Sequence, residues 1–262
     1  MTMNPDDNNT RPRRGVYLLP NLLTTGCLFW GFYAIIAAID GNFGRAAMAI
    51  FGAMVFDGLD GRVARLTKTE SVFGKEYDSL ADMVAFGLAP AIVCYQWGVE
   101  RISEYGTAWG RFGWVAAFFY AAAAAMRLAR FNARAAVQDK RYFEGLPSPS
   151  AAALVAAFIW VAHAYDVGGL PGLSLAFVVS VVAGALMVSR FSYPSFKNFA
   201  GAERVSFGML LLVPLTFALI ALDPPVVLLS LFGGFALFAP LNWVWRRFRR
   251  RGPRDAQDPP PG

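Results

Sequence analysis

The chain has 262 residues, of which 56% are hydrophobic and 16% charged, and its formal net charge is +6. Soluble domains carry charge on about a quarter of their residues, so this composition excludes an ordinary soluble domain and indicates a polytopic membrane protein. We attribute the positive charge to membrane topology and to attraction for anionic membrane lipids, and we expect no nucleic-acid partner.

Eight apolar windows approach the length of about 20 residues that a membrane-spanning helix needs. Because the fifth to seventh are short, six or seven spans stay open as alternatives. We predict an all-α membrane protein of about eight transmembrane helices, a six-helix core followed by two C-terminal helices. The windows lie near residues 18–39, 44–64, 76–98, 112–131, 150–166, 172–189, 205–221 and 225–245.

The composition along the chain also predicts its division into segments. A disordered basic tail is expected at 1–15 and a membrane domain at 16–204. Two additional transmembrane helices follow at 205–246, and a basic, Pro-rich disordered tail at 247–262.

Basic residues are distributed unequally between the two sides that this span pattern creates. If the N-terminus is cytoplasmic, 21 of the 24 Lys and Arg residues fall in cytoplasmic segments, and the exceptions are Arg45, Arg101 and Arg111. Short cytoplasmic loops carry an excess of Lys and Arg, so both termini are predicted to be cytoplasmic. Cys27 and Cys94 then lie near opposite leaflets, and we expect no disulfide between them.

Asn21 and Thr24 lie on one face at the cytoplasmic end of the first predicted helix. Such side chains often cap a helix or form hydrogen bonds between helices. The alternative is that they contact a ligand bound at the same depth.

Four aspartates fall inside the second and third windows, where each charge costs roughly 2.5–3.5 kcal/mol on insertion scales. Asp57 and Asp60 are three residues apart and Asp78 and Asp82 are four apart, so each pair lies on one helical face. Asp57 lies about 20 Å along its helix, which brings both pairs to a similar depth. Oxygen-only ligands suit Mg²⁺ or Mn²⁺, and we expect two divalent cations. An ion-coordinating transporter is the alternative.

The residues around the aspartates indicate what the metal holds. Gly61 and Ala64 leave room for a bulky group against the helix backbone, and Arg65 and Lys75 offer positive charge at its rim. Metal, small residues and cations together predict a diphosphate site.

Arg127, Arg130 and Arg134 form a stripe along one face of the fourth helix. Positive-inside anchoring explains part of it. Because the stripe begins inside the apolar helix, we also expect it to bind a phosphate or a carboxylate.

The aspartate spacing resembles the complete signature of the CDP-alcohol phosphotransferase family: Asp57-x-x-Asp60-Gly61-x-x-Ala64-Arg65, eight residues, Gly74, three residues, Asp78, three residues, Asp82. The resemblance implies that the four aspartates bind metal and that Asp82 also acts as the catalytic general base. It implies that CDP is bound by Gly61, Ala64, Arg65 and Gly74, with Asn21 and Thr24 as further contacts.

Three segments, Leu-Pro-Asn-Leu-Leu-Thr at 19–24, Arg-Leu-Ala-Arg-Phe-Asn at 127–132 and Gly-Leu-Pro-Ser-Pro at 145–149, are similar to the membrane-integral phosphatidylserine synthases, a branch of this family. The similarity implies metal-assisted transfer of a phosphatidyl group from CDP-diacylglycerol to L-serine, in a homodimer of the bacterial inner membrane whose active site faces the cytoplasm. Glycerol 3-phosphate is the alternative acceptor, and a divalent-ion transporter is the alternative outside the family. The candidates for binding serine are Arg127, Arg130, Asn132, Ser148 and Ser150.

Overall fold

The computed structural model describes residues 18–67, 69, 71–102, 107–134, 142–194 and 207–249. The predicted tail at 1–15 and residues 250–262 of the C-terminal tail lie outside this part of the chain. The described residues are almost entirely helical, as predicted. The helices are α1 (Leu18–Ile39), α2 (Phe43–Thr67), α3 (Val72–Asp82), the π-helical turn η2 (Met83–Leu88), α4 (Ala89–Ile102), α5 (Thr107–Arg134), α6 (Ser148–Ala164), α7 (Gly169–Val188), α8 (Phe207–Leu222) and α9 (Pro224–Arg249).

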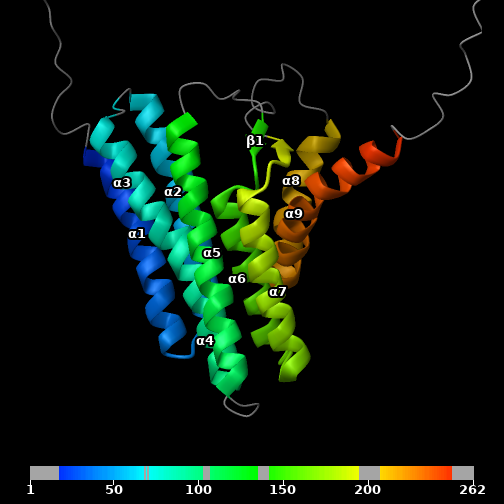
Figure 1. The fold of residues 1–262 in the computed structure, drawn as a ribbon. Coiled ribbons are helices and arrows are strands. Elements are labelled where there is room, and N and C mark those ends of the chain that lie inside the picture. Colours follow the sequence, from blue (N-terminus) through cyan, green and yellow to red (C-terminus); the bar gives the residue numbers. More distant parts are fainter. Residues whose placement is uncertain are drawn as a thin grey trace, which may run out of the picture.

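Every predicted apolar window overlaps one continuous helical segment, and the third window corresponds to α3, η2 and α4 together. Successive segments alternate in direction, so the start of α1 and the end of α9 lie at the same, upper end in Figure 1. Helix α9 continues to Arg249, three residues into the range predicted as a tail.

Four helical segments in the described part of the chain are long and apolar enough to cross a membrane, against eight predicted spans. Helix α6 is apolar but only 17 residues long. Helix α2 carries charged residues along its length, among them the first two signature aspartates. The four segments are Leu18–Ile39, Val72–Gly98, Gly169–Val188 and Pro224–Arg247.

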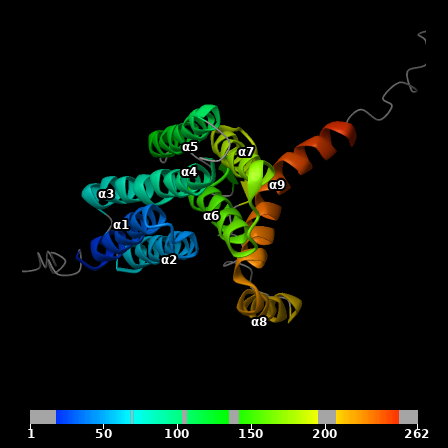
Figure 2. The same ribbon diagram turned by 90° about the horizontal axis from the view of Figure 1, so that it is seen from below.

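Small side chains bring the helices into close contact. Alanines dominate the buried core, including Ala34, Ala46 and Ala53, which are fully buried. Small residues permit the close backbone approach through which helices associate in a membrane. Viewed along the helices, α1, α2 and α3 lie side by side, and α8 lies at the edge against α9 (Figure 2). Cys27 and Cys94 are buried and unpaired, as predicted.

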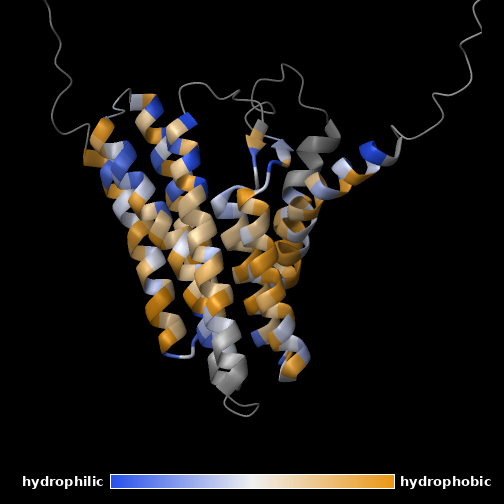
Figure 3. Ribbon diagram, viewed as in Figure 1, coloured by the Kyte–Doolittle hydropathy of each residue, from blue (hydrophilic) through white to orange (hydrophobic). Residues whose placement is uncertain are grey.

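Two short strands, which the sequence did not predict, join distant loops. β1 (Tyr142–Glu144) pairs antiparallel with β2 (Ser192–Pro194), with Phe143 opposite Tyr193. The ribbon ties the segment before α6 to the segment after α7, on the side where Figure 3 shows hydrophilic residues gathered at the upper ends of α2, α3 and α5. The strand pair therefore lies at the polar end of the helices.

Candidate active site

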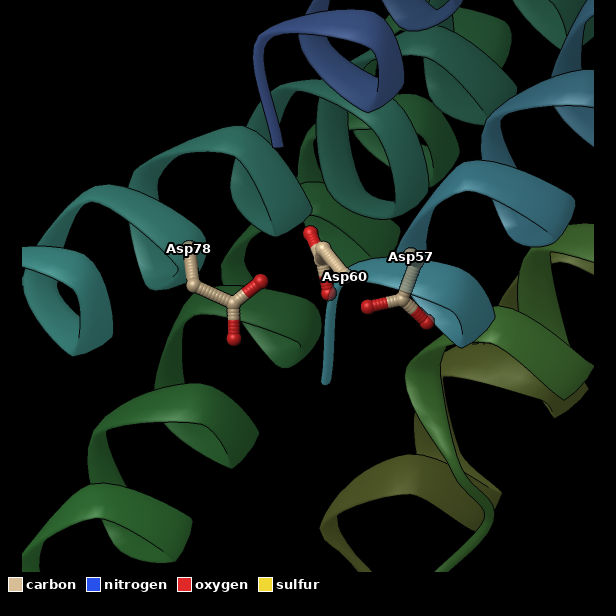
Figure 4. Close-up of side chains that lie close together, drawn as sticks. All are labelled: Asp57, Asp60 and Asp78. Atoms are coloured by element: carbon tan, nitrogen blue, oxygen red, sulfur yellow. The ribbon is translucent and has the colours of Figure 1, made fainter. Parts of the chain in front are cut away.

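The carboxylates of Asp57, Asp60 and Asp78 converge from two helices. Asp57 and Asp60 project from α2 and Asp78 from α3, and one ligand atom from each lies within 4.8 Å of the others. Figure 4 shows the three side chains turned toward a common space. Asp60 is 5% exposed, and the other two are half-buried. The predicted meeting of the two acid pairs is confirmed for these three residues.

Asp82 lies one helical turn beyond Asp78, at the last position of α3. It is outside the three-carboxylate group, but it interacts with Asp57 and with the charge of Arg127. Its Oδ1 atom is buried and has no hydrogen-bond partner among the described residues. A buried carboxylate oxygen without a partner is costly unless a proton, an ion or a substrate satisfies it.

The arrangement fits divalent cations. Three carboxylates this close repel one another, and the orphaned oxygen of Asp82 adds a fourth acidic group beside them. Hard oxygen ligands of this kind are those that Mg²⁺ and Mn²⁺ prefer.

Hydrogen bonds from residues of α1 and at the start of α3 hold the parts of the site in position. The Thr24 hydroxyl, buried on α1, donates to Asp60 Oδ2 at 2.8 Å and so orients that carboxylate. Ser71 caps the start of α3 by accepting a hydrogen bond from the Gly74 backbone N–H at 2.9 Å. A Cβ at Gly74 would lie 3.1 Å from Ser71 Oγ and 3.5 Å from Asn21 Oδ1, so glycine permits this close approach.

An open pocket adjoins the carboxylates and encloses about 640 Å³ of empty space, including solvent at its mouth. All six residues predicted to contact CDP line it, together with Lys75 and two of the aspartates. Pro20, Thr69 and Ser71 also line it and were not predicted, although serine is a preferred residue at the start of a helix. The complete lining is Pro20, Asn21, Thr24, Asp60, Gly61, Ala64, Arg65, Thr69, Ser71, Gly74, Lys75 and Asp78.

The arginine stripe lines a second, smaller and shallow pocket between α5 and β1, with about 270 Å³ of empty space that includes open solvent. Arg127, Arg130 and Arg134 contribute to it, with Phe143 and Glu144 opposite. Arg127 is 8% exposed and donates from Nη1 to Ser148 Oγ at 2.6 Å. Its buried Nε has no hydrogen-bond partner in the described part of the chain. A buried cation with an unused donor is suited to an anionic ligand.

Arg130 and Arg134 have different partners. Arg130 donates to the backbone carbonyls of Val188 (3.0 Å), Glu144 (3.1 Å), Met187 (3.2 Å) and Ser189 (3.4 Å). It therefore joins the C-terminus of α7 to the end of β1. Arg134 forms an exposed ion pair with Glu144 at 2.7 Å, a type of contact that contributes little stability.

The other serine-binding candidates are divided between the two sides of the site. Asn132 Nδ2 donates to Ser79 Oγ at 2.8 Å, beside Asp78 on α3. Ser148 is buried at the start of α6, and Ser150 is half-buried in the first turn of that helix. The structure thus brings Ser148 to Arg127 and places Asn132 against α3.

Comparison with known proteins agrees with this architecture. The family model described as CDP-alcohol phosphatidyltransferase matches residues 17–192. The chain is 36% identical over 237 residues to the CDP-diacylglycerol–serine O-phosphatidyltransferase of Helicobacter pylori strain J99, covering 89% of this chain and 94% of that protein. It is 40% identical over 153 residues to the enzyme of the same name from Mycobacterium tuberculosis H37Rv, covering 54% and 49%. It is 34% identical over 178 residues to the archaetidylserine synthase of Methanothermobacter thermautotrophicus, covering 67% and 69%.

The family match covers all the signature aspartates and both pockets, and the similarity to the Helicobacter protein extends over most of both chains. The apolar helices and this match together identify an integral membrane protein. The chain belongs to the CDP-alcohol phosphatidyltransferase family and is an enzyme of that family.

Proposed function

We propose that the protein transfers the phosphatidyl group of CDP-diacylglycerol to the hydroxyl of L-serine, giving phosphatidylserine and CMP. The observation that carries the proposal is the position of Asp82. It interacts both with Asp57 of the carboxylate cluster and with the charge of Arg127 in the arginine pocket. The names of the relatives from Helicobacter and Mycobacterium support serine as the acceptor.

The open pocket holds the CDP portion in this proposal. Asn21, Thr24 and Gly74 lie along its α1 and α3 walls, and Gly61 has open space where a Cβ would stand. Arg65 and Lys75 supply positive charge for the diphosphate at the rim.

Asp57, Asp60, Asp78 and Asp82 would hold two divalent cations, Mg²⁺ or Mn²⁺, and the bound ions would supply positive charge near the diphosphate and the departing CMP. Arg127 binds the serine carboxylate through its unused donor, and Ser148 keeps the guanidinium in place. Asp82 accepts the proton of the serine hydroxyl while the hydroxyl oxygen of serine attacks the lipid-side phosphorus. The bond from that phosphorus to CMP breaks in the same displacement.

The finer topology belongs to the same proposal. Eight passes with cytoplasmic termini place both pockets on the cytoplasmic side of a bacterial inner membrane, in accord with the alternating helix directions in Figure 1. Arg247, which lies over the Trp243 ring at 5.3 Å from its centroid, anchors the end of α9 among anionic lipids. Helix α8, which packs against α9 at the edge, offers a surface for a homodimer.

The test is CMP release by purified protein from labelled CDP-diacylglycerol, with serine, glycerol 3-phosphate, inositol and water offered separately. We expect release with serine and the formation of phosphatidylserine. Release with glycerol 3-phosphate instead would assign the alternative acceptor. No release with any alcohol, together with Mn²⁺ uptake by proteoliposomes, would assign a transporter. Asp57→Asn is the inactive control in each assay.

A further inference from the structure

The π-helical turn η2 begins directly after Asp82 and ends two residues before Pro90. In a regular α-helix the carbonyl of Phe86 accepts a hydrogen bond from the N–H of residue 90, and proline has no N–H. The proline ring also crowds the carbonyl four residues earlier. The backbone accommodates Pro90 by widening, with the Ala89 N–H bonded to the Val84 carbonyl five residues back.

Tyr120 replaces the donor that Pro90 lacks. Its ring is fully buried on α5, and its hydroxyl donates to the Phe86 carbonyl at 3.1 Å. A buried carbonyl that loses its partner is costly, so this bond stabilises the widened turn over a regular α-helical turn.

Helix α1 confines the same turn from another side. A Cβ on Gly31 would lie 2.6 Å from Ala85 Cα, so only glycine allows α1 to approach the turn this closely. Gly87 in the turn faces Ala124 of α5, where an added Cβ would lie 3.3 Å from the Ala124 Cβ. The turn is therefore held between α1 and α5, and the rotation of α3 about its axis is fixed relative to α4.

The same tyrosine contact occurs a second time, away from the carboxylates. Pro240 lies within the continuous helix α9, the carbonyl four residues earlier belongs to Ala236, and the buried Tyr193 donates its hydroxyl to that carbonyl at 2.8 Å. The two tyrosines make the same chemical contact, but only Tyr120 acts on a turn that adjoins the acidic site. Tyr193 therefore provides a matched control.

We infer that Tyr120 is a positioning residue, which holds the proline-induced π-turn and thereby turns Asp78 and Asp82 of α3 toward Asp57 and Asp60 of α2. The inference rests on the proposed metal-dependent function. An α-helical turn in place of η2 would rotate α3 by part of a turn and separate the two acid pairs. In this inference the hydroxyl of Tyr120 acts through the backbone carbonyl of Phe86.

The experiment compares Tyr120→Phe, Tyr193→Phe and Pro90→Ala with the wild type in detergent. Unfolding temperature is followed during Mn²⁺ titration, and kcat is measured alongside. Both tyrosine variants should lower the metal-free unfolding temperature by about 4 °C, since each leaves one buried carbonyl unsatisfied. Only Tyr120→Phe should raise the Mn²⁺ concentration for half-maximal stabilisation, by about tenfold, the low end for groups that orient metal ligands.

Pro90→Ala restores the missing N–H, so we expect an unfolding temperature at or above that of the wild type with the same weakened Mn²⁺ response. A Tyr120→Phe protein that responds to Mn²⁺ as Tyr193→Phe does would overturn the inference, as would a wild-type response in Pro90→Ala. A wild-type protein that neither binds Mn²⁺ nor releases CMP would instead overturn the proposed function.

Discussion

Exchanging Arg127 and Arg130 separately for lysine should affect two different properties. Arg130→Lys should mainly lower stability, and Arg127→Lys should mainly weaken serine binding. Lysine keeps the charge but concentrates its donors on one nitrogen. The four carbonyls around Arg130 belong to two segments, the end of β1 and the end of α7, so one ammonium cannot reach all of them. Loss of two such bonds at about 1.5 kcal/mol each amounts to about 3 kcal/mol.

A loss of this size should lower the unfolding temperature of Arg130→Lys by about 6 °C or more. For Arg127→Lys we expect a smaller change in unfolding temperature and a KM for serine raised about tenfold, equivalent to about 1.4 kcal/mol. The KM for CDP-diacylglycerol should change little in both variants. Arg134→Lys, which alters an exposed ion pair of the same stripe, is the matched control and should resemble the wild type.

The assay combines thermal unfolding of the purified proteins with steady-state kinetics below the lowest unfolding temperature. An Arg130→Lys protein with wild-type stability and a tenfold higher KM for serine would refute this reasoning. Arg130 would then be a carboxylate ligand, and its bonds to the carbonyls would be incidental.

Four further outcomes test the site and its packing. Excess chelator should abolish CMP release and added Mn²⁺ should restore it, and full turnover in chelator would exclude the metal-assisted mechanism. Asp57→Asn should be inactive yet insert normally, because it removes a half-buried charge, and membrane fractionation and activity measurements check both outcomes. Asp82→Asn should lose most of kcat while retaining CDP-diacylglycerol binding in a direct binding assay, whereas equal loss of both would make Asp82 chiefly a metal ligand. Gly31→Ala should destabilise the protein by about 1–3 kcal/mol in thermal unfolding, since its Cβ meets the backbone of Ala85, and an unchanged unfolding temperature would show that α1 can shift freely.

The positions of the helices could be predicted well from the sequence, because long apolar windows indicate membrane helices directly. The first window, 18–39, coincides with α1, and the window at 44–64 falls within α2. Number and orientation of membrane crossings depend on the bilayer as well as on the chain, so eight passes and cytoplasmic termini stay predictions. The fifth window illustrates the difficulty, since α6 is apolar but short.

The acidic site could also be predicted from the sequence, because helical spacing and equal depth are properties of the local sequence. Those two properties predicted that Asp57 and Asp60 would meet Asp78, and the structure confirms it. That the six CDP candidates bind a nucleotide stays a prediction, although all of them line one pocket.

The remaining features arise from contacts between distant segments. The stripe of arginines indicated a common face. It could not show that Arg130 would donate hydrogen bonds to backbone carbonyls some 57 residues away along the chain. Nor could local patterns pair β1 with β2. The π-turn had a visible cause in Pro90, but the partner that makes it stable, Tyr120, comes from another helix.

The two pockets are encoded by separate stretches of chain. Every residue that lines the larger one falls between positions 20 and 78, whereas the arginine pocket is built between 127 and 144. Substitutions in the second stretch leave every residue that lines the larger pocket unchanged. Under the proposed function, the acceptor alcohol can therefore change while the residues assigned to the nucleotide stay the same, and chimeras that swap only residues 127–148 between relatives would test this.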